Sequence, residues 1–119
     1  MELEILIAVK PTIYKEIEII ITLKFSNPIE SCKNMFRGLN NITEIDLSQF
    51  DSSHVSTVSY MFQGCSNIIS IDLTNLNTGN VKDISYMFSN CSSLENINFG
   101  NINTSLIENE EFVFLGVQN

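Results

Sequence analysis

Two different apolar spacings follow one another along most of this chain. The first set is spaced three, two and three residues apart: Ile42, Ile45, Leu47 and Phe50. Its central pair, two residues apart, predicts a short strand with one buried face. The second set is spaced three, four and three residues apart: Val55, Val58, Phe62 and Cys65. That spacing places all four side chains on one face of a helix, so it predicts an α-helix after the strand.

Both patterns return at a fixed interval of 26 residues. Met35-Phe36 recurs as Met61-Phe62 and again as Met87-Phe88, with 61 − 35 = 26 and 87 − 61 = 26. A fixed period of this size is typical of a solenoid, in which no repeat buries its apolar face alone. The predicted core signature consists of these strand and helix positions: Ile45, Leu47, Phe62, Ile71, Leu73, Phe88, Ile97 and Phe99.

Residues that favour helix ends bracket the second pattern. Candidate N-cap residues precede it: Ser52 or Ser53, and Thr78. Residues that tolerate a left-handed C′ conformation follow it: Gly38, Gly64 and Asn90. Each unit is therefore expected to be a helix, a turn, a strand and a return loop. Stacked units would give an α/β fold with a parallel sheet on one side and short helices on the other.

The two ends of the chain depart from the repeat. Residues 16–25 and Leu3, Ile5, Ile7 and Val9 alternate as strands do. Since Ile19 lies 26 residues before Ile45, residues 16–25 are expected to form the first rung of the sheet, and residues 3–9 to cover its open end. Glu110 falls where Ile84 stands, so a fourth helix after residue 105 would be degenerate, and residues 112–114 fit a strand equally well. The predicted organisation is a β cap over 1–28, three repeats with a leading helix over 29–107, and a degenerate end over 108–119.

The strand half of the repeat is close to a leucine-rich repeat, although Phe50, Leu76 and Ile102 stand where the usual ladder asparagine would be. The joint pattern Ile-Asp-Leu-Ser-x-Phe-Asp-Ser-Ser-x-Val followed by Ser-Tyr-Met-Phe-x-Gly-Cys-Ser is more specific. Over residues 29–105 it resembles the BspA-type leucine-rich repeat family of surface proteins from mycoplasmas, other bacteria and protists. The resemblance implies a right-handed α/β solenoid that takes part in adhesion or protein–protein contact, without catalysis.

The net charge of the chain argues against two classes of binding partner. The formal net charge is −8, with six Lys and Arg against 14 Asp and Glu. Binding to nucleic acid or to an anionic membrane surface needs clustered basic residues, so this composition argues against both as partners. No segment approaches the roughly 20 apolar residues that span a bilayer, and the opening residues do not resemble a signal peptide. The sequence therefore predicts no membrane insertion and leaves the compartment open, although the resemblance suggests the cell surface.

Residues that often carry chemistry have plainer explanations here. Cys65 and Cys91 stand where the first repeat has Leu39, and Cys32 stands where the second has Val58. Buried reduced thiols are therefore expected, because equivalent positions on stacked rungs are poorly oriented for a disulfide. The one histidine, His54, is expected to be a solvated turn residue. With no nucleophile motif, metal motif or cofactor motif, the sequence predicts neither an enzyme nor a bound metal or cofactor.

The candidate binding face lies on the outer side of the predicted sheet. Its residues are polar and recur with the repeat: Asp46, Ser48, Asp72, Thr74 and Asn98. Adjacent parallel strands lie about 4.8 Å apart, so the two carboxylates would be solvated, hydrogen-bonded or bridged by a cation. A plain polar surface, a ligand-binding face and a weak Ca²⁺ site are the alternatives. Tyr60 and Tyr86 form a second column that either completes packing between repeats or adds binding surface.

The sequence leaves two functions open. The first is a non-catalytic recognition or adhesion module whose outward polar column meets another protein or a cell-surface ligand. The second is a structural or assembly subunit, which could be intracellular, whose ends dock onto other chains through residues such as Phe112 and Phe114. An extracellular surface protein with further repeats would favour the first function.

Overall fold

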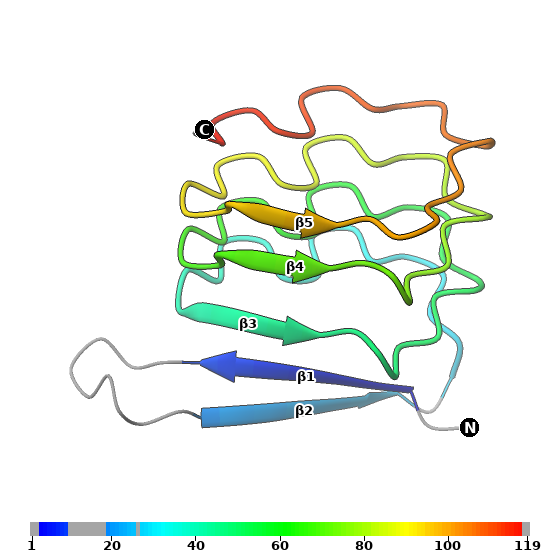
Figure 1. Cartoon of the computed structure of the whole chain (residues 1–119). Coiled ribbons are helices and arrows are strands. Elements are labelled where there is room, and N and C mark those ends of the chain that lie inside the picture. Colours follow the sequence, from blue (N-terminus) through cyan, green and yellow to red (C-terminus); the bar gives the residue numbers. More distant parts are fainter. Residues whose placement is uncertain (1–2, 10–18, 26, 118–119) are drawn as a thin grey trace.

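The chain forms a stack of similar coils in which residues 26 apart lie one above another. The computed structural model describes residues 3–9, 19–25 and 27–117. Five strands run along one side of the stack (Figure 1). Their bounds are Leu3–Val9 for β1, Ile19–Phe25 for β2, Ile42–Asp46 for β3, Ser70–Asp72 for β4 and Asn96–Asn98 for β5.

The strands form two hydrogen-bonded groups. β4 and β5 pair in parallel, with Ile71 opposite Ile97. β3 lies beside β4 and points the same way (Figure 1), but its sheet partner is β1, in the order β2-β1-β3. The single parallel sheet expected from the repeat is thus divided between β3 and β4.

The expectation that residues 16–25 form the first rung was wrong for residues 19–25, and residues 16–18 lie outside the described residues. β1 lies between β2 and β3 and is antiparallel to both, with Ile7 opposite Ile21 on one side and Ile45 on the other. The 26-residue offset of Ile19 from Ile45 predicted a parallel neighbour for β3. β1 takes the place beside β3 instead. In that place both edges of β1 are hydrogen-bonded, one to β2 and the other to β3. The cap over the N-terminal end is a β-hairpin rather than one strand over a first rung.

The predicted helices are also absent from the described residues. Each helical pattern instead forms a run of consecutive turns, over residues 33–38, 59–64, 85–90 and 111–116, here named the turn runs. Bonds from residue i to i−3, such as Met61 N–H to the Val58 carbonyl at 3.1 Å, tighten each run. Alternate N–H groups donate to the next coil, as Phe62 does to the Met87 carbonyl at 3.0 Å. No helix in the described part of the chain could span a membrane.

Left-handed residues explain why the turn runs are not helices. Near the start of each run one residue has a positive φ: Asn34 at 62°, Tyr60 at 58°, Tyr86 at 57° and Phe112 at 56°. A second occurs near its end: Gly38 at 75°, Gly64 at 76°, Asn90 at 59° and Gly116 at 79°. A left-handed residue redirects the following backbone, so the chain advances in steps and its N–H groups point along the stack. A spacing of three, four and three fits this stepped path as well as it fits a helix.

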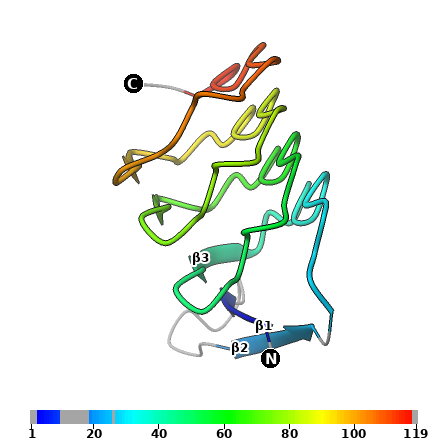
Figure 2. The same cartoon turned by 90° about the vertical axis from the view of Figure 1, so that its right-hand side faces the viewer.

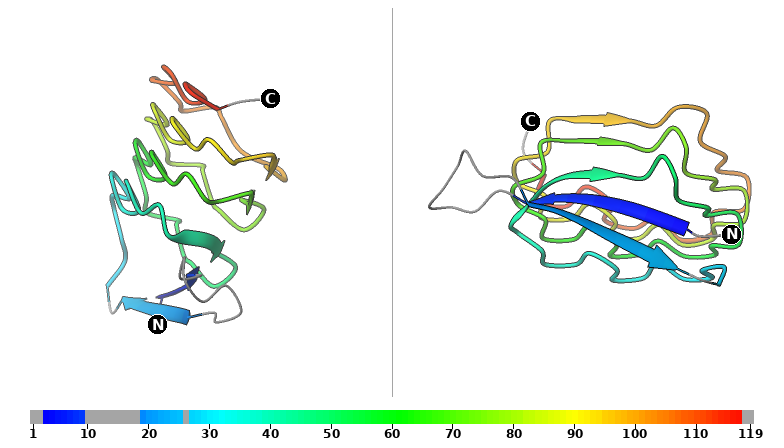
Figure 3. Two further views of the ribbon diagram at one scale, coloured as in Figure 1. Left: turned by 90° about the vertical axis from the view of Figure 1, so that its left-hand side faces the viewer. Right: turned by 90° about the horizontal axis from the view of Figure 1, so that it is seen from below.

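The strands and the turn runs lie on opposite sides of the stack (Figures 2 and 3). The buried apolar side chains of both form one core cluster. Phe36, Phe62, Phe88 and Phe114 stack face to face from coil to coil, with successive ring centroids 5.7, 5.6 and 5.9 Å apart. Six of the eight predicted core residues are buried, whereas Ile97 is half-buried and Phe99 is 40% exposed. Ile97 lies in β5 and Phe99 directly follows it, and no later strand among the described residues covers them.

The end of the chain continues the stack for half a coil. Asn109 forms a parallel bridge with Asp83, which in turn bridges Thr57, and Thr57 bridges Ser31. Residues 111–116 then form the fourth turn run, so neither the degenerate helix nor the strand considered for this segment is present. Val117, the one described residue after this run, is not in a strand.

Candidate partner-binding face

The five residues of the candidate face lie together on the outer side of the strands. Asp46 ends β3, Asp72 ends β4 and Asn98 ends β5, and Ser48 and Thr74 follow two residues after the aspartates. All five are exposed. Inward neighbours such as Leu47 and Leu73 are buried at 3% and 2% exposure, so the alternation along each strand separates this face from the core.

Each acidic or amide side chain of this column caps its own turn. The Ser48 N–H donates to Asp46 Oδ1 at 2.8 Å, and the Thr74 N–H donates to Asp72 Oδ1 at 2.9 Å. In the last coil the Gly100 N–H donates to Asn98 Oδ1 at 3.1 Å. An Asp or Asn that accepts the N–H two residues on is an Asx turn. The repeated acidic position is therefore explained first by the need to redirect the chain after each strand.

These hydrogen bonds also lower the pKa of the two carboxyl groups. The Ser48 hydroxyl and then the Ser48 N–H hold the pKa of Asp46 below its usual value, although desolvation and then the charge of Asp72 act to raise it. The Thr74 N–H and then its hydroxyl lower the pKa of Asp72. Hydrogen bonds to the charged form favour ionisation. The face therefore carries two fixed negative charges at neutral pH.

Asx turns also recur at two other positions of the repeat, both outside this face. In the return loops, Asp51, Asn77 and Asn103 accept N–H groups two residues on, at 3.0, 2.9 and 2.9 Å. Before the turn runs, Asp83 accepts the Ser85 N–H at 2.9 Å and Asn109 accepts the Glu111 N–H at 3.2 Å. Because these turns repeat where no face was predicted, an Asx turn by itself does not mark a binding residue.

Buried hydroxyls link the coils, which the sequence interpretation missed. Ser52 Oγ donates to the Asn77 carbonyl at 3.2 Å and accepts the Asn77 N–H at 2.7 Å. Thr78 Oγ1 repeats this with Asn103, at 2.9 and 2.8 Å. Both residues were expected to cap helices. Their recurrence at the 26-residue interval was the available signal that they bond to a neighbouring coil.

The Tyr60 and Tyr86 side chains pack between coils. Their rings stack with centroids 4.7 Å apart and planes within 5°, and Phe112 continues the column at 5.2 Å. The Arg37 guanidinium lies 4.9 Å from the centre of the Tyr60 ring. Both tyrosines are half-buried. Of the two interpretations of this column, the contacts favour packing between repeats.

The thiols and the histidine offer no reactive site in the described residues. Cys32, Cys65 and Cys91 are free and fully buried, and Cys65 Sγ donates to the Phe36 carbonyl at 3.1 Å. Burial raises the pKa of Cys65 to about 12. His54 is exposed, with its Nδ1 3.1 Å from Ser53 Oγ.

The described residues also give the Ca²⁺ hypothesis no support. No group of three or more His, Cys, Asp and Glu side chains lies close enough there to hold a metal ion. The third residue of the Asp46 and Asp72 column is Asn98, so the column offers an amide there and not a third carboxylate.

Comparison with known proteins identifies a family. Residues 17–119 match the family described as "Mycoplasma protein of unknown function, DUF285". Because the match covers most of the chain, this protein belongs to that family. No curated protein and no solved structure matches the chain.

Proposed function

We propose that this chain is a non-catalytic recognition or adhesion module of a BspA-like surface protein, built as a leucine-rich-repeat-like, right-handed solenoid. Membership of the mycoplasma family supports this proposal, together with the joint strand and turn motif that repeats from residue 29 to residue 105. The bridges between Ser31, Thr57, Asp83 and Asn109 support the solenoid architecture, since they join positions 26 residues apart. The proposed location is the cell surface.

The observation that carries the proposal is a column of exposed polar side chains on strands whose other face is buried. Asp46, Asp72 and Asn98 occupy the same position on three consecutive strands, while the opposite face of those strands packs into the core. A regular array of charged and amide groups on rigid strands suits a protein partner, because little ordering is needed on binding. The partner would present basic or amide groups to the two carboxylates.

The test needs variants that remove charge without unfolding the turns. Asp46→Asn combined with Asp72→Asn keeps the side-chain oxygen that each turn requires, as Asn98 does in the third coil. A photo-crosslinking residue at Ser48, introduced in cells that produce the protein, is expected to trap a discrete protein partner. The double variant should reduce that product severalfold. Asp51→Asn is the matched control, because Asp51 caps an equivalent turn outside the face.

An unchanged yield in the double variant, or an equal product from a crosslinker at Lys82, would count against this face. Lys82 is exposed and lies outside the polar column.

The alternative is a structural or assembly subunit, or a spacer. It is favoured by exposed aromatic residues at the last coil, where Phe112 and Phe114 are 54% and 49% exposed. Light scattering separates the two functions, because assembly requires concentration-dependent association that is lost in Phe112→Ser and Phe114→Ser.

A further inference from the structure

The strand side of the stack is interrupted between β3 and β4. β4 pairs with β5, and the Leu73 N–H continues that ladder by donating to the Asn98 carbonyl at 2.8 Å. Leu47 holds the equivalent position one coil earlier, and its N–H donates to no described residue. The Glu95 N–H donates to the Ile69 carbonyl at 2.8 Å, whereas the N–H of Ile69 itself also lacks an acceptor among the described residues. The boundary between residues 42–47 and 69–73 is here named the joint.

The two coils that meet at the joint are hydrogen-bonded on either side of it. On the turn side, four N–H groups of the first coil donate to carbonyls of the second, from Cys32 at 3.0 Å to Gly38 at 2.7 Å. In the return loop, Ser52 Oγ exchanges two hydrogen bonds with the backbone of Asn77, at 3.2 and 2.7 Å. The interruption is therefore confined to the strands.

The paired and the unpaired strands differ in the charge that they bring together. Across the paired strands, Asp72 lies opposite Asn98, so one carboxylate faces an amide. At the joint the position equivalent to Asp72 is Asp46, so two carboxylates meet, and the exposed Glu44 adds a third on β3. The charge of Asp72 acts to raise the pKa of Asp46, so the two groups interact. Like charges on neighbouring strands oppose their pairing.

The segment that carries these three carboxylates supplies no counter-charge of its own. Residues 38–81 contain no Lys or Arg. Arg37, which precedes this segment, lies on the turn side with its guanidinium 4.9 Å from the centre of the Tyr60 ring. Hydrogen bonds within the Asx turns lower the pKa values of Asp46 and Asp72 and so keep both groups charged at neutral pH.

We propose that the joint is a conformational switch within the candidate partner-binding face. It stays unpaired while Asp46 and Asp72 repel each other, and it closes into a continuous ladder when a Lys or Arg side chain of the bound partner lies between them. Leu47 and Leu73, 3% and 2% exposed, hold both strands to the core, so closure aligns two preformed halves of the face. Binding of a basic partner thereby stiffens the strand side of the stack.

The trigger of this switch rests on the proposed recognition function, because it takes the partner to be a protein with basic groups at this face. The joint itself does not rest on that function, since a substitution can close it with no partner present. The competing cause of the interruption is the hairpin, because β3 also pairs with β1.

Amide hydrogen exchange of the full chain, followed by NMR residue by residue, reads the joint. In the unaltered chain the Leu47 N–H should exchange at least about tenfold faster than the Leu73 N–H. Asp72→Asn reproduces the amide of Asn98, which caps the same kind of turn, and should slow exchange at Leu47 at least about tenfold. Because residue 72 is not next to Leu47 in the sequence, the substitution leaves the intrinsic exchange rate of that N–H unchanged.

A second variant and a matched control accompany this measurement. Asp46→Asn acts from the opposite strand and should slow exchange at the Ile69 N–H. Asp51→Asn makes the same change in an Asx turn outside the joint, so both N–H groups should exchange as in the unaltered chain. Added salt should slow Leu47 in the unaltered chain but not in Asp72→Asn, because only the unaltered joint has opposed charges to screen.

A tetralysine peptide is the probe for the trigger. In excess it should slow exchange at Leu47 severalfold in the unaltered chain, whereas a tetraglutamate peptide should have no effect.

Fast exchange at Leu47 in Asp72→Asn and at Ile69 in Asp46→Asn would overturn the proposal and assign the interruption to the hairpin. Slowing by substitution but not by tetralysine would overturn the part played by a basic partner. If the joint closes in Asp72→Asn but the crosslinker at Ser48 traps no partner, the proposed function fails while the joint stands.

Discussion

At the scale of the residue, left-handed backbone positions decide the path of each turn run. Gly38 and Gly64 have φ values of 75° and 76°, and Asn90 holds the equivalent place at 59°. A Cβ added at Gly38 would meet nothing within 4 Å, so only the backbone conformation resists a side chain there. At Gly116 a Cβ would also overlap the side-chain oxygen of Asn90.

We therefore expect Gly38→Ala to lower the free energy of unfolding by about 1 kcal/mol, from left-handed strain alone. Gly116→Ala should cost more, because it adds a steric overlap to the same strain. Urea unfolding of the two variants measures both effects. A loss as large at Gly38 as at Gly116 would show that the overlap with Asn90 is relieved at no cost.

The buried thiols give a second prediction at this scale. Burial raises the pKa values of Cys32 and Cys91 to about 11 and that of Cys65 to about 12. In the native chain a thiol reagent should find no reactive group even at a pH of about 9.5, above the ordinary cysteine value of about 8.5. All three should react after unfolding. A thiol that reacts in the folded chain would show that the core opens.

The same shifts fix how stability depends on alkaline pH. A raised pKa in the folded state means that the folded chain holds more protons above the ordinary thiol value. Stability is then full below a pH of about 8.5 and falls as the pH rises toward the folded values. Cys65→Ala should flatten this slope while lowering stability at neutral pH, because it removes a fully buried side chain.

At the scale of the element, the stacked phenylalanines are the main packing unit. Phe62 lies between Phe36 and Phe88, with ring centroids 5.7 and 5.6 Å away, and is fully buried. Phe114 has a ring neighbour on one side only among the described residues.

Phe62→Ala is expected to lower the free energy of unfolding by about 3–5 kcal/mol, because it empties the middle of the column. Phe114→Ala should cost less than about 1 kcal/mol, since that ring is half exposed. Thermal or urea unfolding of both variants provides the comparison. Equal losses would mean that the Phe114 ring is covered in solution.

The Asx turns give a pH prediction of the opposite sign to the thiols. The pKa values of Asp46, Asp51 and Asp72 are lowered by hydrogen bonds within their turns, at Asp51 from the Ser53 hydroxyl and then its N–H. Stability from these groups is present above the ordinary aspartate value of about 3.9 and is lost as the pH falls through the lowered folded values. Between about pH 5 and about pH 2, the Asp46→Asn/Asp72→Asn variant should therefore lose less stability than the unaltered chain does.

Sequence reasoning recovered the repeat and most of the core at this scale but not the local backbone. The strand positions Ile45 and Ile71 and the inward Phe62 and Phe88 follow directly from apolar spacing, and they are buried. The helices were wrong because the same spacing fits a chain of turns. Tyrosine rarely adopts a left-handed φ, so the residue types at positions 60 and 86 do not predict one. The N–H groups of Tyr60 and Tyr86 donate to the next coil, and these hydrogen bonds accompany the left-handed conformation.

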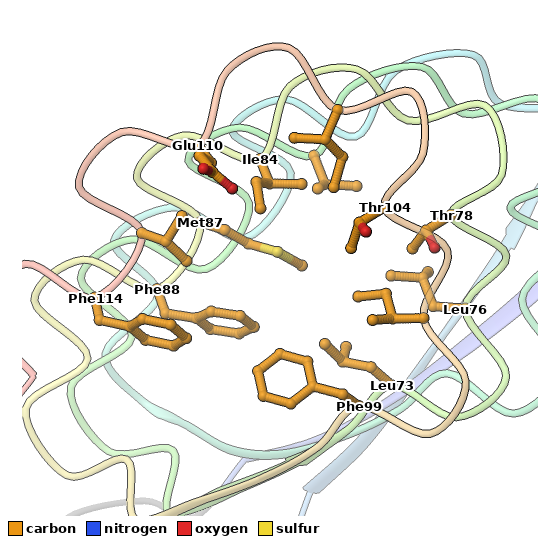
Figure 4. Close-up of a pocket in the computed structure, with 14 residues that line it drawn as sticks. Leu73, Leu76, Thr78, Ile84, Met87, Phe88, Phe99, Thr104, Glu110 and Phe114 are labelled. Atoms are coloured by element: carbon orange, nitrogen blue, oxygen red, sulfur yellow. The ribbon is translucent and has the colours of Figure 1, made fainter.

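The candidate site was predictable only in part for a related reason. The positions of Asp46, Asp72 and Asn98 on successive strand ends followed from the period, and they are exposed as expected. Their role as turn caps depends on the backbone two residues further on. The cavity of about 350 Å³ lined by Glu110 and Phe114 (Figure 4) is formed by side chains of several coils together, so no pattern within one repeat predicts it.

At the scale of the whole molecule, the hairpin cap controls the exposure of the core. Phe25 contacts Phe50, with ring centroids 6.4 Å apart, and its side chain is partly buried against the core. Thr22 lies on the same strand and is exposed.

Phe25→Asp is expected to destabilise the chain by roughly 2 kcal/mol, because a charge replaces an apolar contact at the cap. It should also increase self-association by exposing the end of the core. Thr22→Asp, the control on the same strand, should change stability by less than about 0.5 kcal/mol. Unfolding and light scattering of both variants test this, and equal behaviour would mean that β2 does not cover the core.

The period of hydrogen bonds along the stack has a consequence for how such a gene changes over time. Ser52, Thr78 and the stacked rings each contact a residue about one repeat away. An in-frame duplication or loss of 26 codons would therefore place each inner side chain beside a neighbour of the same kind. Unequal recombination between repeats would alter the length of the molecule without any compensating substitution in its interior.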